Sequence, residues 1–262
     1  MKVSYFPGCT LKTKAKDLDV YARKSAEVLG ITLEEIENWQ CCGGVFTTST
    51  DEIATKLSSV RALKEAKSKN QPLVSVCSAC HNVIKQTNAA MANDQTFNSR
   101  VNNYMAEEPY NGETKVLHYL ELLRDVVGFD KLKEKVVNPL KGKKIGAYYG
   151  CLLLRPNGVM KMDDPENPTI MEDFIRALGA DPVIYAYRNE CCGGYIALED
   201  ALSAKKKSTA VVDNANAHGA DIIVTACPLC KYNLEKAGCD IPVVYLTELL
   251  AEALGVKEDT NE

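Results

Sequence analysis

Ten of the eleven cysteines in this chain of 262 residues form two copies of one ordered pattern. Each copy has a single cysteine, then an adjacent pair followed by two glycines, then a Cys-x-x-Cys sequence. The first copy is Cys9, Cys41, Cys42, Cys77 and Cys80, and the second is Cys151, Cys191, Cys192, Cys227 and Cys230. The pair and the Cys-x-x-Cys sequence are 35 residues apart in both copies. Such a recurrence predicts internal duplication.

The repeat extends beyond the cysteines into the apolar segments around them. Residues 73–77 match residues 223–227, and residues 116–123 resemble residues 243–250. A polar and basic stretch lies between the two copies, over residues 131–144. We therefore predict two cysteine-rich domains of similar structure, residues 1–135 and residues 136–262.

Apolar runs that alternate with helical patterns predict an α/β fold with two tandem units, each a small parallel sheet flanked by helices. The expected strands are residues 2–6, 32–36, 72–76 and 115–118, then 144–148, 182–186, 221–225 and 243–246. The expected helices are residues 17–29, 51–69, 83–92 and 120–127, then 169–178, 198–218, 229–237 and 247–254. Every cysteine of the two sets lies at or after the end of a predicted strand. In a parallel sheet this gathers five thiols at one edge of each unit.

Composition narrows the chemistry of these thiols. The net charge of −4 argues against binding to nucleic acid. The chain has no apolar run near the ~20 residues that span a membrane, and residues 1–11 lack the apolar core of a signal peptide. We therefore expect a cytoplasmic protein, and in that compartment eleven cysteines favour metal or redox chemistry over disulfides.

Cysteine thiolates bind zinc or the iron of a sulfide cluster. The two adjacent cysteines of a pair converge on one site only if the backbone turns sharply, and Gly43 and Gly193 allow that turn. Five thiolates in each half exceed the four of a zinc site or a cubane cluster, so the pattern favours an unusual iron–sulfur centre. Zinc in one or both halves, a thioredoxin-type Cys-x-x-Cys and disulfides are the alternatives. Cys239 has no counterpart in the first half, and we expect a structural thiol there.

The full pattern resembles the duplicated CCG domain of the heterodisulfide reductase B-subunit family. The resemblance covers nearly the whole chain, with ten cysteines in the family's order. Residues 150–156 and 163–169 are similar to the branch of this family found outside the methanogens. The methanogen form has prolines after its first cysteine pair, where this chain has Gly43, Gly44 and Val45.

The resemblance implies a function. Each five-cysteine set of the family holds a noncubane 4Fe–4S cluster, and a disulfide bound between the two clusters is cleaved to two thiols. The chain has no Gly-x-Gly-x-x-Gly sequence and no phosphate-binding loop, so electrons must come from a partner. The family implies a ferredoxin-like iron–sulfur subunit and a flavin-containing subunit as partners.

Two further expectations concern activity. His81 directly follows Cys80, and an imidazole there could donate a proton to a departing thiolate. A hydrogen-bonded histidine with no catalytic role is the alternative. A non-catalytic electron-relay or docking subunit, with zinc or a single cluster, is the alternative to the catalytic subunit, but retention of all ten cysteines favours catalysis.

Overall fold

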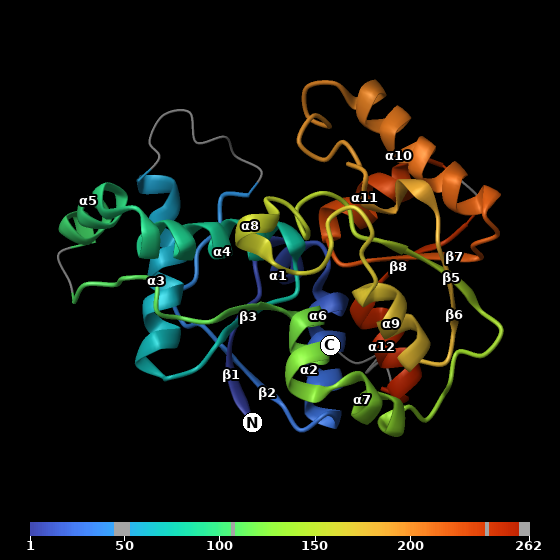
Figure 1. Ribbon diagram of the computed structural model, residues 1–262, viewed down its shortest axis with the longest axis horizontal. Coiled ribbons are helices and arrows are strands. Elements are labelled where there is room, and N and C mark those ends of the chain that lie inside the picture. The colour runs from blue at the N-terminus through green and yellow to red at the C-terminus, as the bar shows by residue number, and fades with distance from the viewer. Residues whose placement is uncertain (45–52, 106–107, 239–240, 257–262) are drawn as a thin grey trace.

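The structure is a computed structural model that describes residues 1–44, 53–105, 108–238 and 241–256 (Figure 1). It contains two four-stranded parallel sheets with the same strand order, β2-β1-β3-β4 and β6-β5-β7-β8. Their strands are β1 (Lys2–Phe6), β2 (Thr32–Glu35), β3 (Leu73–Ser75), β4 (Val116–His118), β5 (Lys144–Tyr148), β6 (Asp181–Val183), β7 (Ile222–Thr225) and β8 (Val243–Tyr245). The predicted fold class, two similar α/β units, is confirmed. The boundary between residues 135 and 136 stays a prediction, and Cys239 lies outside the described residues.

The central strands are apolar because helices cover both faces of each sheet. Val3, Tyr5 and Phe6 of β1 are fully buried, although alternate side chains of a strand point to opposite faces. In the parallel register, Tyr5 pairs with Val74 of β3 and Val74 pairs with Leu117 of β4. The carboxyl ends of these strands therefore lie at a common edge, where the cysteine loops begin.

The helices agree in part with the predicted ones. Those of the first unit are α1 (Cys9–Thr13), α2 (Lys16–Val28), α3 (Ala54–Ser68), α4 (Ser78–Asn93), α5 (Gln95–Met105), α6 (Tyr119–Glu121), the π-helical turn η1 (Leu122–Val127) and α7 (Phe129–Lys135). Those of the second unit are α8 (Asn157–Met160), α9 (Ile170–Ala177), the 3-10 turn η2 (Ala186–Asn189), α10 (Ala201–Ala217), α11 (Pro228–Lys236) and α12 (Leu246–Leu254). The sequence prediction missed α1, α5, α7 and α8, and residues 51–52 of one expected helix lie outside the described residues.

The two units share one continuous hydrophobic core. In Figure 1, α2 of the first unit and α12 of the second lie side by side in the lower middle of the view, and the two helices pack directly against each other. The hydroxyl of Thr247 in α12 donates a hydrogen bond to the carbonyl oxygen of Leu18 in α2, at 3.0 Å. The polar and basic stretch at residues 131–144 begins within α7, which packs on α9 and whose Leu132 is fully buried. The units are therefore fixed relative to each other.

Candidate metal centre

The first set of cysteines lies on three loops at the carboxyl edge of the first sheet. Cys9 begins α1, three residues after the end of β1, and Cys41 and Cys42 follow β2. Cys77 is the N-cap of α4, and Cys80 lies in the first turn of that helix. The Sγ atoms of Cys41 and Cys9 are 3.8 Å apart, and those of Cys42 and Cys80 are 3.3 Å apart. The structure therefore brings together cysteines separated by more than 30 residues in the sequence.

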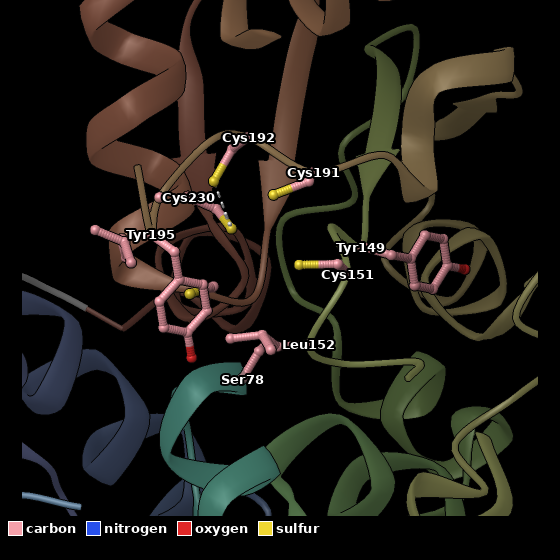
Figure 2. A pocket seen from close by; sticks show the side chains of 11 residues that line it. Ser78, Tyr149, Cys151, Leu152, Cys191, Cys192, Tyr195 and Cys230 are labelled. Carbon is pink, nitrogen blue, oxygen red and sulfur yellow. Dashed lines mark hydrogen bonds between the residues drawn. The ribbon is translucent and has the colours of Figure 1, made fainter. Parts of the chain in front are cut away.

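The second set repeats this arrangement. Cys227 is the N-cap of α11, and Cys230 lies in its first turn. The Sγ atoms of Cys192 and Cys230 are 3.5 Å apart, as in the equivalent pair of the first unit. Figure 2 shows Cys151, Cys191, Cys192 and Cys230 around one pocket. All five cysteines of the second set line this pocket.

The loop of each adjacent cysteine pair turns in the same way. Gly43 and Gly193 have positive φ angles of 78° and 80°, which glycine adopts without a steric penalty. Each glycine then donates its N–H to the sulfur of the first cysteine of the pair, at 3.5 Å to Cys41 and 3.3 Å to Cys191. Both sulfur atoms thus receive a backbone donor, a contact that by itself favours the thiolate form. For Cys41, contact with Cys42 and burial outweigh this donor and raise the pKa.

Contacts among the thiols also favour thiolates. A thiol that donates a hydrogen bond stabilises the negative charge on the neighbouring sulfur. Contact with Cys41 and then with Cys80 lowers the pKa of Cys42 to about 3. In the second unit, contact with Cys151 and Cys192 lowers the pKa of Cys191 to about 2. The partner thiols shift the other way, since contact with Cys42 raises the pKa of Cys41 and contact with Cys191 raises that of Cys151. Each set therefore has a thiol that favours the thiolate, the form in which cysteine binds metal.

The two sets meet where the two units touch. The backbone N–H of Ser78 donates to the carbonyl oxygen of Ala226 at 3.0 Å, and the hydroxyl of Ser78 donates to the same oxygen at 2.8 Å. These residues adjoin Cys77 and Cys227, whose buried thiols interact with each other and thereby raise the pKa of Cys77. The first cysteines of the two Cys-x-x-Cys sequences are thus neighbours across the interface.

Tyr245 joins the same two loops. It ends β8, and its hydroxyl lies 2.7 Å from the carbonyl oxygen of Val76 and 3.0 Å from that of Ala226. Its counterpart in the first unit, His118 at the end of β4, places Nε2 2.9 Å from the same Val76 oxygen. Both carbonyls belong to residues that directly precede a cysteine, so these side chains fix the distance between the two sets. The sequence analysis did not predict this role for Tyr245. Its one signal in the sequence is that it occupies the position equivalent to His118 in the repeat.

A glycine precedes the first cysteine of each set. Because it has no side chain, the sulfur of the last cysteine of the set can lie close to the backbone there. A Cβ atom on Gly8 would lie 2.9 Å from the Sγ of Cys80, and one on Gly150 would lie 3.3 Å from the Sγ of Cys230. Both glycines also have positive φ. Any larger residue at either position would therefore press on a cysteine of the set.

Five convergent thiols per unit, thiolate-stabilising contacts and glycine-lined space fit a sulfur-ligated iron–sulfur group. In the described ranges, no group of three or more Cys, His, Asp and Glu side chains has the arrangement that holds a single metal ion. The sulfur atoms instead contact one another in pairs, at 3.3 to 3.8 Å.

His81 lies behind the first set, in the core. Its ring centroid is 5.5 Å from that of His118, and its Nε2 is 3.3 Å from a carboxylate oxygen of Glu121. Among the described residues, neither ring nitrogen has a hydrogen-bond partner, and burial lowers the pKa of His81 well below its usual value. The imidazole is therefore neutral near pH 7, and its role as a proton donor stays a prediction.

The chain has two α/β units, each with a parallel sheet that gathers five cysteines at one edge. This arrangement defines a duplicated cysteine-rich domain protein. The chain belongs to the CCG family, because the family model described as a cysteine-rich domain matches residues 3–85 and 145–235. Both matched segments contain one complete set of five cysteines.

Named relatives extend over almost the whole chain. The 8-methylmenaquinol:fumarate reductase membrane anchor subunit of Wolinella succinogenes is 33% identical, with 97% of this chain and 92% of that protein covered. A protein of Archaeoglobus profundus that is named as like the heterodisulfide reductase B subunit is 28% identical, with coverage of 97% and 91%. The B subunit of the ferredoxin/F420H2-dependent CoB-CoM heterodisulfide reductase of Methanosarcina acetivorans is also 28% identical, with coverage of 98% and 91%.

A solved structure supports the fold. The crystal structure of a hypothetical protein from Helicobacter pylori matches with a TM-score of 0.77 and 12% identity. The match covers 98% of this chain and 49% of that chain, so this chain spans about half the length of its structural relative. Among the described residues, no helix combines the length and the apolar character needed to cross a membrane.

The contact of Tyr245 with both units can be tested by its removal. Tyr245→Phe takes away the hydroxyl proton shared between two buried carbonyls, which should lower the free energy of unfolding by about 1–3 kcal/mol. Anaerobic urea denaturation measures this loss. Tyr232→Phe is the control, since Tyr232 is 56% exposed, and it should change stability by less than about 0.5 kcal/mol. Equal stability of the two variants would contradict the bridging role.

Proposed function

We propose that this chain is the iron–sulfur catalytic subunit of a heterodisulfide reductase-like complex. In this role it reduces a disulfide to two thiols, or runs the reverse reaction. The observation that carries the proposal is the meeting of the two cysteine sets at Cys77 and Cys227, which would place two redox centres beside one shared cleft. Reduction of a disulfide to two thiols needs two electrons, and two adjacent one-electron centres could supply them.

We further propose that the cysteines hold two noncubane 4Fe–4S clusters, which would supply one-electron transfer and an iron site for sulfur. The proposed ligands are Cys9, Cys41, Cys42, Cys77 and Cys80 for one cluster, and Cys151, Cys191, Cys192, Cys227 and Cys230 for the other. The chain's own contribution is to hold these thiolates at one edge, leave glycine-lined space beside them and align the two sets.

The reaction must balance two electrons and two protons for each disulfide. The electrons come, in this proposal, from a ferredoxin-like iron–sulfur subunit and a flavin-containing subunit of a cytoplasmic complex. The names of the Archaeoglobus and Methanosarcina relatives support this assignment, since those proteins are heterodisulfide reductase subunits or similar to them. His81 stays the candidate proton donor of the first set, with Glu121 beside it and Lys85 3.0 Å from the Glu121 carboxylate.

A second candidate function is electron relay within a quinol:fumarate reductase-like complex. The Wolinella relative favours it, because its identity of 33% exceeds that of the heterodisulfide reductase relatives given above. In this role the adjacent sets would pass single electrons, and one of them could hold zinc or lack a cluster. The two candidates differ in a simple respect, since only the first requires a disulfide to react at the site.

Removal of one proposed ligand should affect one cluster only. Cys192→Ala is expected to abolish the electron paramagnetic resonance signal of the second-unit cluster and leave that of the first unit. Cys239→Ala is the matched control, because Cys239 belongs to neither set, and it should leave both signals. Unchanged spectra in Cys192→Ala would refute the ligand assignment.

The space beside Cys80 offers an independent test of cluster binding. Gly8→Ala should lower bound iron to about half, from about eight iron ions per chain, because the new Cβ would lie 2.9 Å from a ligand sulfur. Gly30→Ala is the matched control: its φ of 76° is near the 77° of Gly8, but nothing lies within 4 Å of its Cβ. Both variants carry about 1 kcal/mol of backbone strain, so an equal loss of iron in both would contradict the assignment.

The reaction itself is tested with a panel of disulfides and reduced methyl viologen as the electron donor. Anaerobically purified protein should contain about eight iron ions and no zinc, and should consume two electrons per disulfide. Protein with this iron content that reduces no disulfide, yet accepts electrons from a quinol, would favour the relay function. About one zinc and four iron ions per chain would contradict the two-cluster proposal.

A further inference from the structure

Tyr195 lines the pocket of the second cysteine set but is not a ligand candidate. It follows Cys192 by three residues, directly after the two glycines of the Cys-Cys-Gly-Gly turn. The backbone turns at Gly193, which has a positive φ, and the Tyr195 side chain then lines the pocket while 45% of the residue stays exposed. Figure 2 shows the Tyr195 hydroxyl pointing toward Ser78, a residue of the first unit.

The other hydroxyl groups that line this pocket are already engaged. The Tyr149 hydroxyl donates to the carboxylate of Glu172 and points away from the cysteines (Figure 2). The Ser78 hydroxyl donates to the carbonyl oxygen of Ala226 at 2.8 Å. Tyr195 has no hydrogen-bond partner among the described residues, so its proton is available to a molecule in the pocket.

The surroundings of Tyr195 connect it to both cysteine sets. Burial, followed by electrostatic interaction with Cys151, Cys42, Cys227 and Cys77, raises the pKa of Tyr195 to about 12. Two of these cysteines belong to each set, so the hydroxyl lies within electrostatic reach of both. A phenol that stays protonated near pH 7 is a hydrogen-bond donor for anionic sulfur.

We propose that Tyr195 donates a hydrogen bond to a sulfur atom of the disulfide and to the thiolate that forms from it. This inference rests on the proposed disulfide chemistry and assigns a catalytic residue to it. The S–S bond breaks as two electrons arrive from the low-potential one-electron carrier of the partner, and two protons from solvent complete the thiols. Tyr195 keeps its own proton. A thiol, with a pKa of about 8.5, is a stronger acid than this phenol, so the phenol does not transfer its proton to the thiolate.

Tyr195→Phe removes the hydroxyl alone. With β-mercaptoethanol disulfide as substrate and reduced methyl viologen as donor, kcat/KM should fall by about 10- to 100-fold, the loss expected for one hydrogen bond to a charged group. The dissociation constant of β-mercaptoethanol, measured by calorimetry on the iron-loaded protein, should rise by about 10-fold. Iron content and paramagnetic spectra should match those of the unaltered protein.

Tyr187→Phe is the matched control, since Tyr187 is 44% exposed and does not line the pocket. It should leave both the kinetic and the binding constants unchanged. An unchanged thiol dissociation constant in Tyr195→Phe overturns the inference, as does a loss of iron, which would make the residue structural. Thiol binding is measured whether or not any disulfide is reduced, so a lack of turnover overturns the proposed function alone.

Discussion

The contact between the two Cys-x-x-Cys loops is the interaction on which the site depends. Each loop ends a buried strand with a carbonyl group that cannot reach water, and an unpaired buried carbonyl costs about 1–3 kcal/mol. The carbonyl of Ala226 is paired by Ser78 from the other unit, and that of Val76 by His118 and Tyr245. Because Ser78 and Tyr245 bond to carbonyl groups of the opposite unit, satisfying these groups also places the two cysteine sets side by side.

The placement of each set follows from local rules that act together. Parallel strands bring the ends of distant segments to one edge, and helix N-termini place a positive end of the backbone dipole at Cys80 and Cys230. Glycines with positive φ then turn the adjacent cysteine pairs toward the same point. None of these features alone collects five sulfur atoms. Together, the strand ends, the helix N-termini and the glycine turns bring all five to one place.

The duplicated units, the eight strands and the grouping of the cysteines could be predicted, because they depend on short apolar runs and on spacing that repeats. The helix α7 was missed because its buried Leu132 lies among lysines, and one buried leucine produces no periodic pattern. The bridging role of Tyr245 could not be predicted, since it depends on the relative orientation of the units. Tyr195 was missed for a related reason: a loop tyrosine acquires its surroundings only when both sets are assembled.

The residues at the unit interface show what duplication must keep and what it can change. Sulfur has no substitute among the side chains as a soft ligand, and both copies contain the same five cysteines. The carbonyl groups behind them need only a donor within reach. A tyrosine hydroxyl at the end of β8 and an imidazole nitrogen at the end of β4 both meet that need, at 2.7 and 2.9 Å from the same oxygen. The interface could therefore diverge in sequence, because the constraint on it is a hydrogen-bond donor and the constraint on the cysteines is their chemical identity.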